Sequence, residues 1–191
     1  MLNFNSADAQ RDFSLIPNGA ICPLHLTVRA GSAGEGGWLR RSKDGNSEGL
    51  DCEFTVLSGE YARQKLWAIF TLTGKTDGHV TAGQISASVL RAILESARGI
   101  KTDDQSEAAV KARTVESFGQ FDGLRFMARI GVEPARGDFK AKNVIDRVIT
   151  PSQPEWRPIE QVPSGPRAAP GNASGSVPAP VSQIGRPAWA T

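Results

Sequence analysis

The residues best suited to chemistry in this 191-residue chain are cations that lie close to aromatic rings. Lysine and arginine neutralise phosphates, and a flat ring stacks on an unpaired base with a gain of about 1–3 kcal/mol. Such residues occur in a glycine-rich loop, in strand-like segments and in a late loop. The set comprises Trp38, Arg40, Arg41, Lys43, Trp67, Arg125, Arg129, Arg136, Phe139, Lys140 and Lys142. Their types predict contacts with a single-stranded nucleic acid.

Two glycine-containing patterns that are typical of nucleotide binding are incomplete. Gly74-Lys75-Thr76 resembles the end of a phosphate-binding loop, but Ile69 stands where that loop requires its first glycine. The glycine-rich run 31–37 is followed by another strand-like segment, whereas a dinucleotide fingerprint requires a helix there. We therefore predict no nucleotide cofactor and interpret the run as a loop.

The candidate metal ligands do not match a known metal site. His25, His79, Cys22 and Cys52 are too scattered for a zinc site of known spacing. Both cysteines stand at apolar positions of strand-like segments, which favours buried free thiols over a disulfide or a metal site. The sequence predicts no metal centre.

Asp51 and Glu53 form the best candidate pair of carboxylates. A nuclease site of the acidic-pair type has a lysine two residues further on, where this chain has Thr55. Solvated carboxylates on the outer side of a strand are the favoured interpretation, and a nuclease is the weakest alternative. On the binding face they would repel phosphate, which counts against nucleic-acid binding. We predict that the protein is not an enzyme.

The elements that must position the candidate residues are five strand-like segments and one good helix. Apolar and polar residues alternate in the first, second and fourth strand-like segments, and both faces of the third are apolar. Apolar residues recur at every fourth position in the helical segment. A second, weaker helix is expected at 105–118. The predicted strands are 20–29, 50–56, 64–73, 124–132 and 143–150, and the main helix is 81–98.

This order matches the OB fold, a five-stranded and partly open barrel. We predict a mainly β fold, with an OB-like barrel over residues 20–150 and the main helix between its third and fourth strands. In such a barrel the loops after the first and fourth strands flank the binding surface. These are the loops that carry most of the candidate cations, and residues 1–19 are expected to form a lead-in.

The composition of the chain bears on its charge, its C-terminal tail and its location in the cell. The net charge is only +2, so contacts with nucleic acid must come from local clustering of cations. Proline, glycine and small residues dominate 151–191, which predicts a flexible, disordered tail. No apolar run approaches the roughly 20 residues that cross a bilayer, and no secretion signal is visible, so we expect a cytoplasmic protein without membrane contacts.

Four segments resemble a phage and prophage protein family. They are WLRRSK (38–43), LDCEFTV (50–56), GEYARQKLW (59–67) and LRAIL (90–94). The resemblance covers about residues 10–150, and its motifs are largely structural. It implies an OB fold and single-stranded DNA binding in phage replication or recombination, in the cytoplasm of a bacterial host.

The tail departs from the acidic tails by which many single-strand-binding proteins recruit partner enzymes. No carboxylate side chain follows Glu160, although Trp189 offers one apolar anchor. Phage or host replication and recombination proteins are nevertheless expected as partners.

Single-stranded DNA binding without catalysis is the predicted function. The alternative is a protein–protein adaptor in which the barrel serves as a scaffold. RNA is not distinguished from DNA, because recognition of the 2′-hydroxyl depends on geometry. Self-association through the edge strand that contains Pro23 also stays open.

Overall fold

The alternation of apolar and polar residues builds one antiparallel sheet in the computed structural model, which describes residues 5–6 and 14–161. Seven strands belong to the sheet, and two of them are very short. The strands are β1 (Ile21–Arg29), β2 (Ser32–Ala33), β3 (Leu39–Arg41), β4 (Ser47–Val56), β5 (Lys65–Gly74), β6 (Arg125–Glu133) and β7 (Lys142–Ile149).

Strand β4 is paired along both of its edges. One edge pairs with β5 from Ser47 to Thr55, and the other pairs with β1 and, further back, with β3. Strand β1 also pairs with β6, and β6 pairs with β7. The long strands therefore follow the order β5-β4-β1-β6-β7, with β5 and β7 at the two ends.

The inner face of this curved sheet forms the core. Every second residue of β4, from Leu50 to Val56, is fully or almost fully buried. The Phe54 ring contacts Phe126 and Phe70 edge to face, with ring centroids 5.9 and 6.3 Å apart. Such aromatic pairs add about 0.5–1.5 kcal/mol to the free energy of burial. They join β4 to β6 and β5 across the interior.

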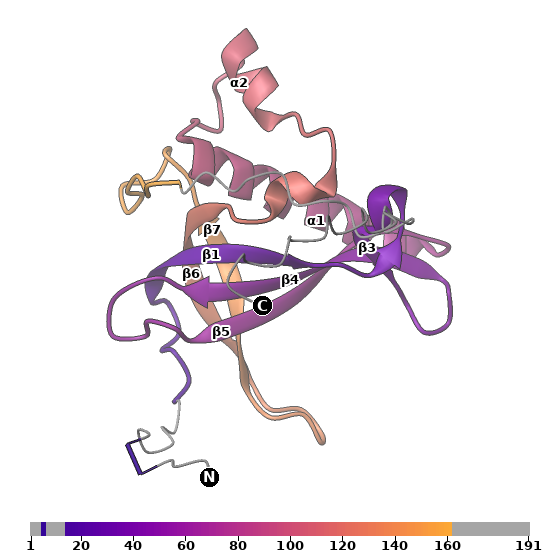
Figure 1. Cartoon of the computed structure of the whole chain (residues 1–191), viewed down its shortest axis with the longest axis horizontal. Coiled ribbons are helices and arrows are strands. Elements are labelled where there is room, and N and C mark those ends of the chain that lie inside the picture. Colours follow the sequence, from indigo (N-terminus) through magenta and orange to yellow (C-terminus); the bar gives the residue numbers. More distant parts are fainter. Residues whose placement is uncertain (1–4, 7–13, 162–191) are drawn as a thin grey trace, which may run out of the picture.

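Two α-helices lie on one side of the sheet, above it in Figure 1. Helix α1 (Asp77–Arg98) contacts β5, β6 and β7, and α2 (Glu107–Arg113) lies beyond it. Short 3-10 turns, η1 and η2, occupy Glu35–Gly37 and Phe118–Phe121. On the opposite side, the hairpin between β6 and β7 projects away from the sheet. The helices therefore cover one side of the sheet, and the hairpin extends from the other side.

The ends of α1 follow local capping chemistry. The Thr76 side chain accepts a hydrogen bond from the His79 backbone N–H, so the helix begins four residues before the predicted start. Gly99 ends the helix as predicted, with φ at 68°. Helix α2 is shorter than predicted, and the Ser106 side chain caps it by accepting a hydrogen bond from the Ala109 backbone N–H.

The prediction of a mainly β fold with a helix after the third long strand is confirmed. A closed five-stranded barrel is not shown, because no hydrogen-bonded ladder joins β5 to β7 within the described part of the chain. Strands β2 and β3 were not predicted. They span two and three residues, which is too short to show an alternating pattern.

Residues on both sides of the predicted domain pack against it. Ile16, in the predicted lead-in, lies in the core. Residues 151–161, placed in the tail by their composition, pack on α1 and β6. The indole Nε1 of Trp156 donates to the Ser96 carbonyl, and Gln161 exchanges two hydrogen bonds with the Arg125 backbone. The rest of the predicted tail, 162–191, lies outside the described residues.

A buried carboxylate connects α1 to α2 and to the loop between them. Glu95 Oε1 accepts hydrogen bonds from Arg91 Nε and Arg113 Nε at 2.8 Å each, and Oε2 accepts one from the Thr102 hydroxyl at 3.1 Å. Burial alone would raise the pKa of Glu95, but the hydrogen bonds from Arg91, Arg113 and Thr102 together lower it.

We expect Arg113→Ala to lower the free energy of unfolding by about 2–4 kcal/mol, because it removes a mostly buried partner of a buried charge. Lys111→Ala, on the exposed side of the same helix, is the control and should be nearly neutral. Urea denaturation of the two variants measures the difference. Equal stability of both variants would contradict a structural role for the Glu95 cluster.

Wild-type stability should also depend on pH through Glu95. Because its pKa is lower in the folded protein than in the unfolded chain, the stabilisation is complete above the unfolded pKa of about 4.3 and is lost as the pH falls through the folded value. Glu95→Gln should flatten this part of the stability profile between neutral and acidic pH.

Candidate functional site

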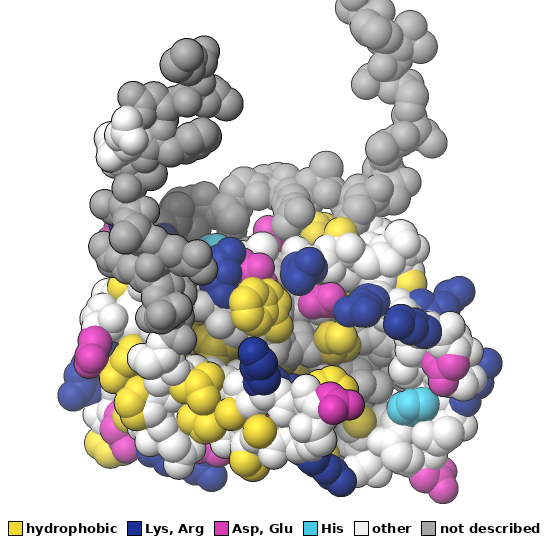
Figure 2. All heavy atoms as spheres, turned by 90° about the horizontal axis from the view of Figure 1, so that it is seen from below, with side chains coloured by type: hydrophobic (Ala, Val, Ile, Leu, Met, Phe, Trp, Pro, Cys, Tyr) yellow, Lys and Arg dark blue, Asp and Glu magenta, His cyan; other side chains and the backbone are white. Residues whose placement is uncertain are grey.

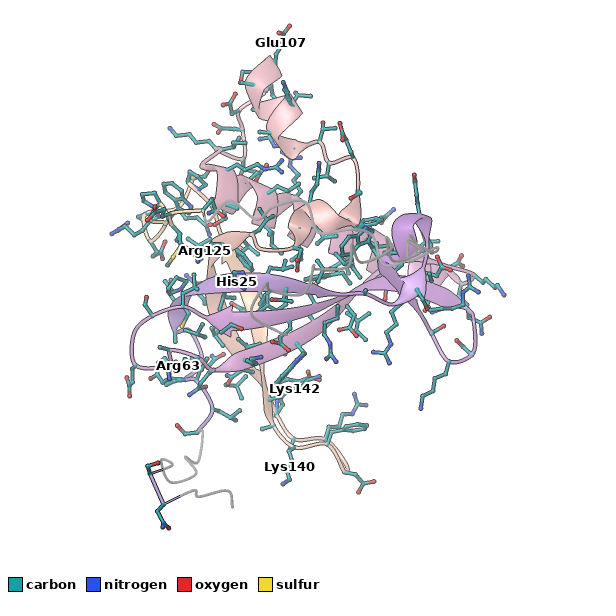
Figure 3. The ribbon with its side chains drawn as sticks, in the orientation of Figure 1. His25, Arg63, Glu107, Arg125, Lys140 and Lys142 are labelled. Atoms are coloured by element: carbon teal, nitrogen blue, oxygen red, sulfur yellow. The ribbon has the colours of Figure 1, made fainter. Side chains whose placement is uncertain are left out.

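A groove of about 560 Å³ lies where the sheet is open, between the first residues of β5 and β7. Residues 63–67 form one wall, residues 141–143 form the other, and Ser14 and Leu15 close one side. Three cations line the groove: Arg63, Lys65 and Lys142. Figure 3 shows Arg63 and Lys142 on this lower side of the molecule.

Asn143 holds the N-terminal segment that closes one side of the groove. Asn143 Oδ1 accepts from the Ile16 backbone N–H at 2.9 Å, and Asn143 Nδ2 donates to the Ile16 carbonyl at 2.8 Å. Since the Ile16 side chain is buried in the core, this segment is fixed both by packing and by hydrogen bonds. Leu15 consequently presents its apolar side chain to the groove and to solvent.

Trp67 provides the aromatic surface of the groove. Its side chain points outward from β5, as the alternation predicted, and 54 % of the residue is exposed. The indole Nε1 donates to Glu53 Oε2 at 3.3 Å, which holds the edge of the ring against the sheet. Ile69, two residues further along the same face, is also exposed. This face therefore offers a ring with an accessible surface beside cations.

The outward carboxylates of β4 are paired rather than simply solvated. Each belongs to one of three ion pairs that follow the strand, so their charges are locally compensated. The pairs are Arg41–Glu48 at 2.7 Å, Arg40–Asp51 at 3.1 Å and Lys65–Glu53 at 2.5 Å. The hydrogen bond from Lys65 is the main reason that the pKa of Glu53 is lowered.

The hairpin between β6 and β7 adds cations without carboxylate partners. Among the described residues, Arg136 and Lys140 form no ion pair, and Phe139 is 81 % exposed. Lys142, at the start of β7, pairs with Glu133 at 3.0 Å, but both side chains are exposed. An exposed pair of this kind contributes only about 0–1 kcal/mol, so a phosphate can replace the carboxylate.

Figure 2 views the molecule from the side of the groove and the hairpin. Hydrophobic side chains there alternate with lysine and arginine side chains, and acidic side chains are fewer. Lysine and arginine side chains therefore lie near apolar surface on this face.

Trp38 does not belong to this surface, which corrects its predicted role as a stacking residue. It is 2 % exposed and packs against η2, where a Cβ on Gly119 would lie only 2.5 Å from the Trp38 ring. The glycine-rich loop that precedes Trp38 forms β2 and η1, and β3 follows directly after Trp38. A ring in this position cannot stack on a base.

Arg125 and Arg129 point away from the core, as predicted, but the C-terminal segment covers them. Arg125 Nη1 donates to the Glu160 carbonyl at 3.2 Å, and Arg129 pairs with Glu155 at 3.4 Å. His25 lies opposite Arg125 in the sheet. Its pKa is lowered by burial and then by Arg125, with Asp122 acting in the opposite direction. Neither arginine lines the groove. Figure 3 shows Arg125 on the helix side of the sheet, away from Arg63 and Lys142.

The structure thus brings together only part of the predicted set. Trp67 and Lys142 line the groove, and Arg136, Phe139 and Lys140 lie on the adjacent hairpin. Arg40 and Arg41 are held in the ion pairs of β4. Lys43 is exposed in the turn before β4, at the end of that strand remote from the groove.

Two groove cations, Arg63 and Lys65, were missed as site residues. Lys65 stands two residues before Trp67, so the alternation of β5 already places both on one face. Arg63 lies in the preceding turn with φ at 72°, a left-handed conformation that costs a non-glycine residue about 1–2 kcal/mol. Nothing in the local sequence pattern indicates that conformation.

The described residues hold no group of three or more side chains suited to binding a metal ion. Cys22 and Cys52 are both free and buried, as predicted, and burial raises the pKa of each thiol. No helix in the described part of the chain combines the length and the apolar character needed to span a membrane.

Comparisons with known proteins identify no family. No protein-family model matches the chain, and no curated protein is significantly similar to it.

Because Trp38 is buried and Trp67 is half exposed, we expect their removal to lower the free energy of unfolding by different amounts. Trp38→Ala should lower the free energy of unfolding by about 3–5 kcal/mol, because it leaves a cavity in the core. Trp67→Ala should cost about 1 kcal/mol or less, because the ring is half exposed. Urea denaturation tests the pair, and equal losses would contradict the placement of the two rings.

Proposed function

We propose that the protein binds single-stranded DNA without catalysis, through the groove between β5 and β7 and the hairpin beside it. The exposed Trp67 ring, beside three groove cations, is the observation that carries this proposal. A single strand presents both unpaired bases and phosphates, and the groove offers a partner for each. In a duplex the bases are already stacked on one another, so an isolated ring on a groove wall gains little from them.

The strand order supports an OB-like architecture. The long strands β5-β4-β1-β6-β7 have the order of an OB barrel that is open between its third and fifth strands. The groove lies at that opening, and the hairpin is the loop after the fourth long strand, which commonly contacts ligands in this fold. The fold supports the proposal by analogy, whereas the side chains of the groove support it directly.

A role in phage replication or recombination rests on the resemblance of four sequence segments alone. The groove has the same chemistry for DNA and RNA, since stacking and charge neutralisation serve both. Each binding experiment should therefore compare an oligoribonucleotide with the oligodeoxyribonucleotide of the same sequence.

We expect Trp67→Ala to weaken binding of a fluorescent oligothymidine by about 5- to 150-fold, which corresponds to the loss of about 1–3 kcal/mol of stacking. Ile69→Ala is the matched control, because Ile69 lies on the same face of β5 but has no ring. Fluorescence anisotropy at low salt measures both. If the wild type binds neither oligothymidine nor a guanine-containing strand at micromolar concentration, the proposed function is wrong.

Arg63→Gly should weaken binding without lowering stability. Glycine adopts the left-handed backbone of position 63 without steric cost, while the phosphate contact is lost. For a single strand, each phosphate contact contributes about −0.7 to the slope of log K against log salt concentration. We expect the slope of Arg63→Gly to be shallower than that of the wild type by about that amount.

Lys111→Ala, which removes a cation from the distant helix α2, is the control and should leave the slope unchanged. An equal change of slope in both variants would indicate binding by overall charge, which contradicts a defined path through the groove.

A further inference from the structure

A carboxylate lies beside the stacking ring of the groove, where a site that only neutralised phosphates would have none. Thr27, Glu53 and Trp67 are opposite one another on adjacent strands β1, β4 and β5, so their side chains form a row across the outer face. The Glu53 side chain is 20 % exposed. It is therefore accessible to a molecule bound on Trp67.

The two contacts of Glu53 leave it with unused acceptor capacity. Oε1 accepts from Lys65 Nζ at 2.5 Å and Oε2 accepts from Trp67 Nε1 at 3.3 Å. A carboxylate has about four acceptor positions, so each oxygen retains one for a further donor. The lowered pKa of Glu53 keeps the group ionised at neutral pH, when it accepts hydrogen bonds but donates none.

The carboxylate distinguishes a base edge from a phosphate. A phosphate has no hydrogen-bond donor for it, whereas an N–H group at the edge of a base can donate to it. Because Glu53 Oε2 accepts from the edge of the indole, a base stacked on that indole can bring its own edge within reach of the carboxylate. The groove cations that remain for the phosphates, Arg63 and Lys142, lie on its walls, and Arg136 and Lys140 lie on the adjacent hairpin.

The four bases differ in what they present to a carboxylate. Guanine has two adjacent donors, N1–H and the N2 amino group, which match the two oxygens. Cytosine and adenine each have one amino group. Thymine has a single N–H between two carbonyl oxygens, and these oxygens are repelled by the negative charge. Bidentate contacts of this kind separate one base from another by about 1–3 kcal/mol in nucleic-acid recognition.

We propose that Glu53 is a specificity-determining residue, which makes the groove prefer single strands with guanine on Trp67. This inference rests on the proposed function and deepens it, because it names the base class that the groove selects. Lys65 contributes by holding one carboxylate oxygen in place, and Trp67 holds the other.

The test compares oligonucleotides of equal length, about twelve nucleotides, and equal charge. One is oligothymidine, the second has isolated guanines among the thymines, and the third has inosine in place of each guanine. Isolated guanines avoid quadruplexes, and inosine lacks only the N2 amino group. Each is titrated against full-length wild type, Glu53→Gln and Asp51→Asn by fluorescence anisotropy.

Asp51→Asn is the matched control variant. Asp51 also points outward from β4, two residues before Glu53, but it pairs with Arg40 and makes no hydrogen bond to Trp67. In Glu53→Gln the amide oxygen can still accept from the indole N–H, so the ring keeps one contact while the charge and one acceptor oxygen are lost.

We expect the wild type to bind the guanine-containing strand about fivefold or more tightly than oligothymidine, with the inosine strand between them. Glu53→Gln should lose this preference and bind oligothymidine as well as the wild type or better, because a negative charge is removed. Asp51→Asn should keep the preference.

Equal binding of the three strands by the wild type, or a guanine preference that survives in Glu53→Gln, would overturn this inference and leave the proposed function intact. Failure of the wild type to bind any of the strands would overturn both.

Discussion

The double pairing of β4 is the constraint on which the rest of the structure depends. A strand with partners along both edges cannot shift by one residue without moving its whole apolar set to the other face. Leu50, Cys52, Phe54 and Val56 therefore stay in the core, and the intervening carboxylates stay outside. The same pairing places Trp67 beside Glu53 and fixes where β5 begins. The groove is a consequence of that position, because β5 and β7 are left without a common ladder.

Periodicity predicted β1 and β4 well, because more and less buried residues alternate along most of each strand. It failed for the loop 30–43. Trp38 stands next to Arg40 and Arg41 in the sequence, but β3 is too short to show which of its neighbours face inward. Burial of Trp38 depends on contact with η2, eighty residues further along the chain, and no local pattern contains that information.

The candidate site was predictable only in part, because the accessibility of a side chain also depends on contacts with segments distant in the sequence. Alternation gave the outward direction of Trp67, Arg125 and Arg129, but direction alone does not decide accessibility. The C-terminal segment covers the two arginines, whereas Trp67 stays half exposed. The composition of residues 151–161 gave no indication of this packing, since the contacts depend on single residues such as Trp156 and Gln161. Arg63 was missed because its position follows from a turn conformation.

The two thiols have a practical consequence for any solution study of this protein. Cys22 and Cys52 are its only cysteines, and both are sealed in adjacent strands, so the native state has no sulfhydryl available to alkylating reagents. Reaction with such a reagent requires the interior to open, which makes its rate a probe of conformational opening. For the same reason, a cysteine introduced on the outer surface can carry a spectroscopic label without competition from the native ones.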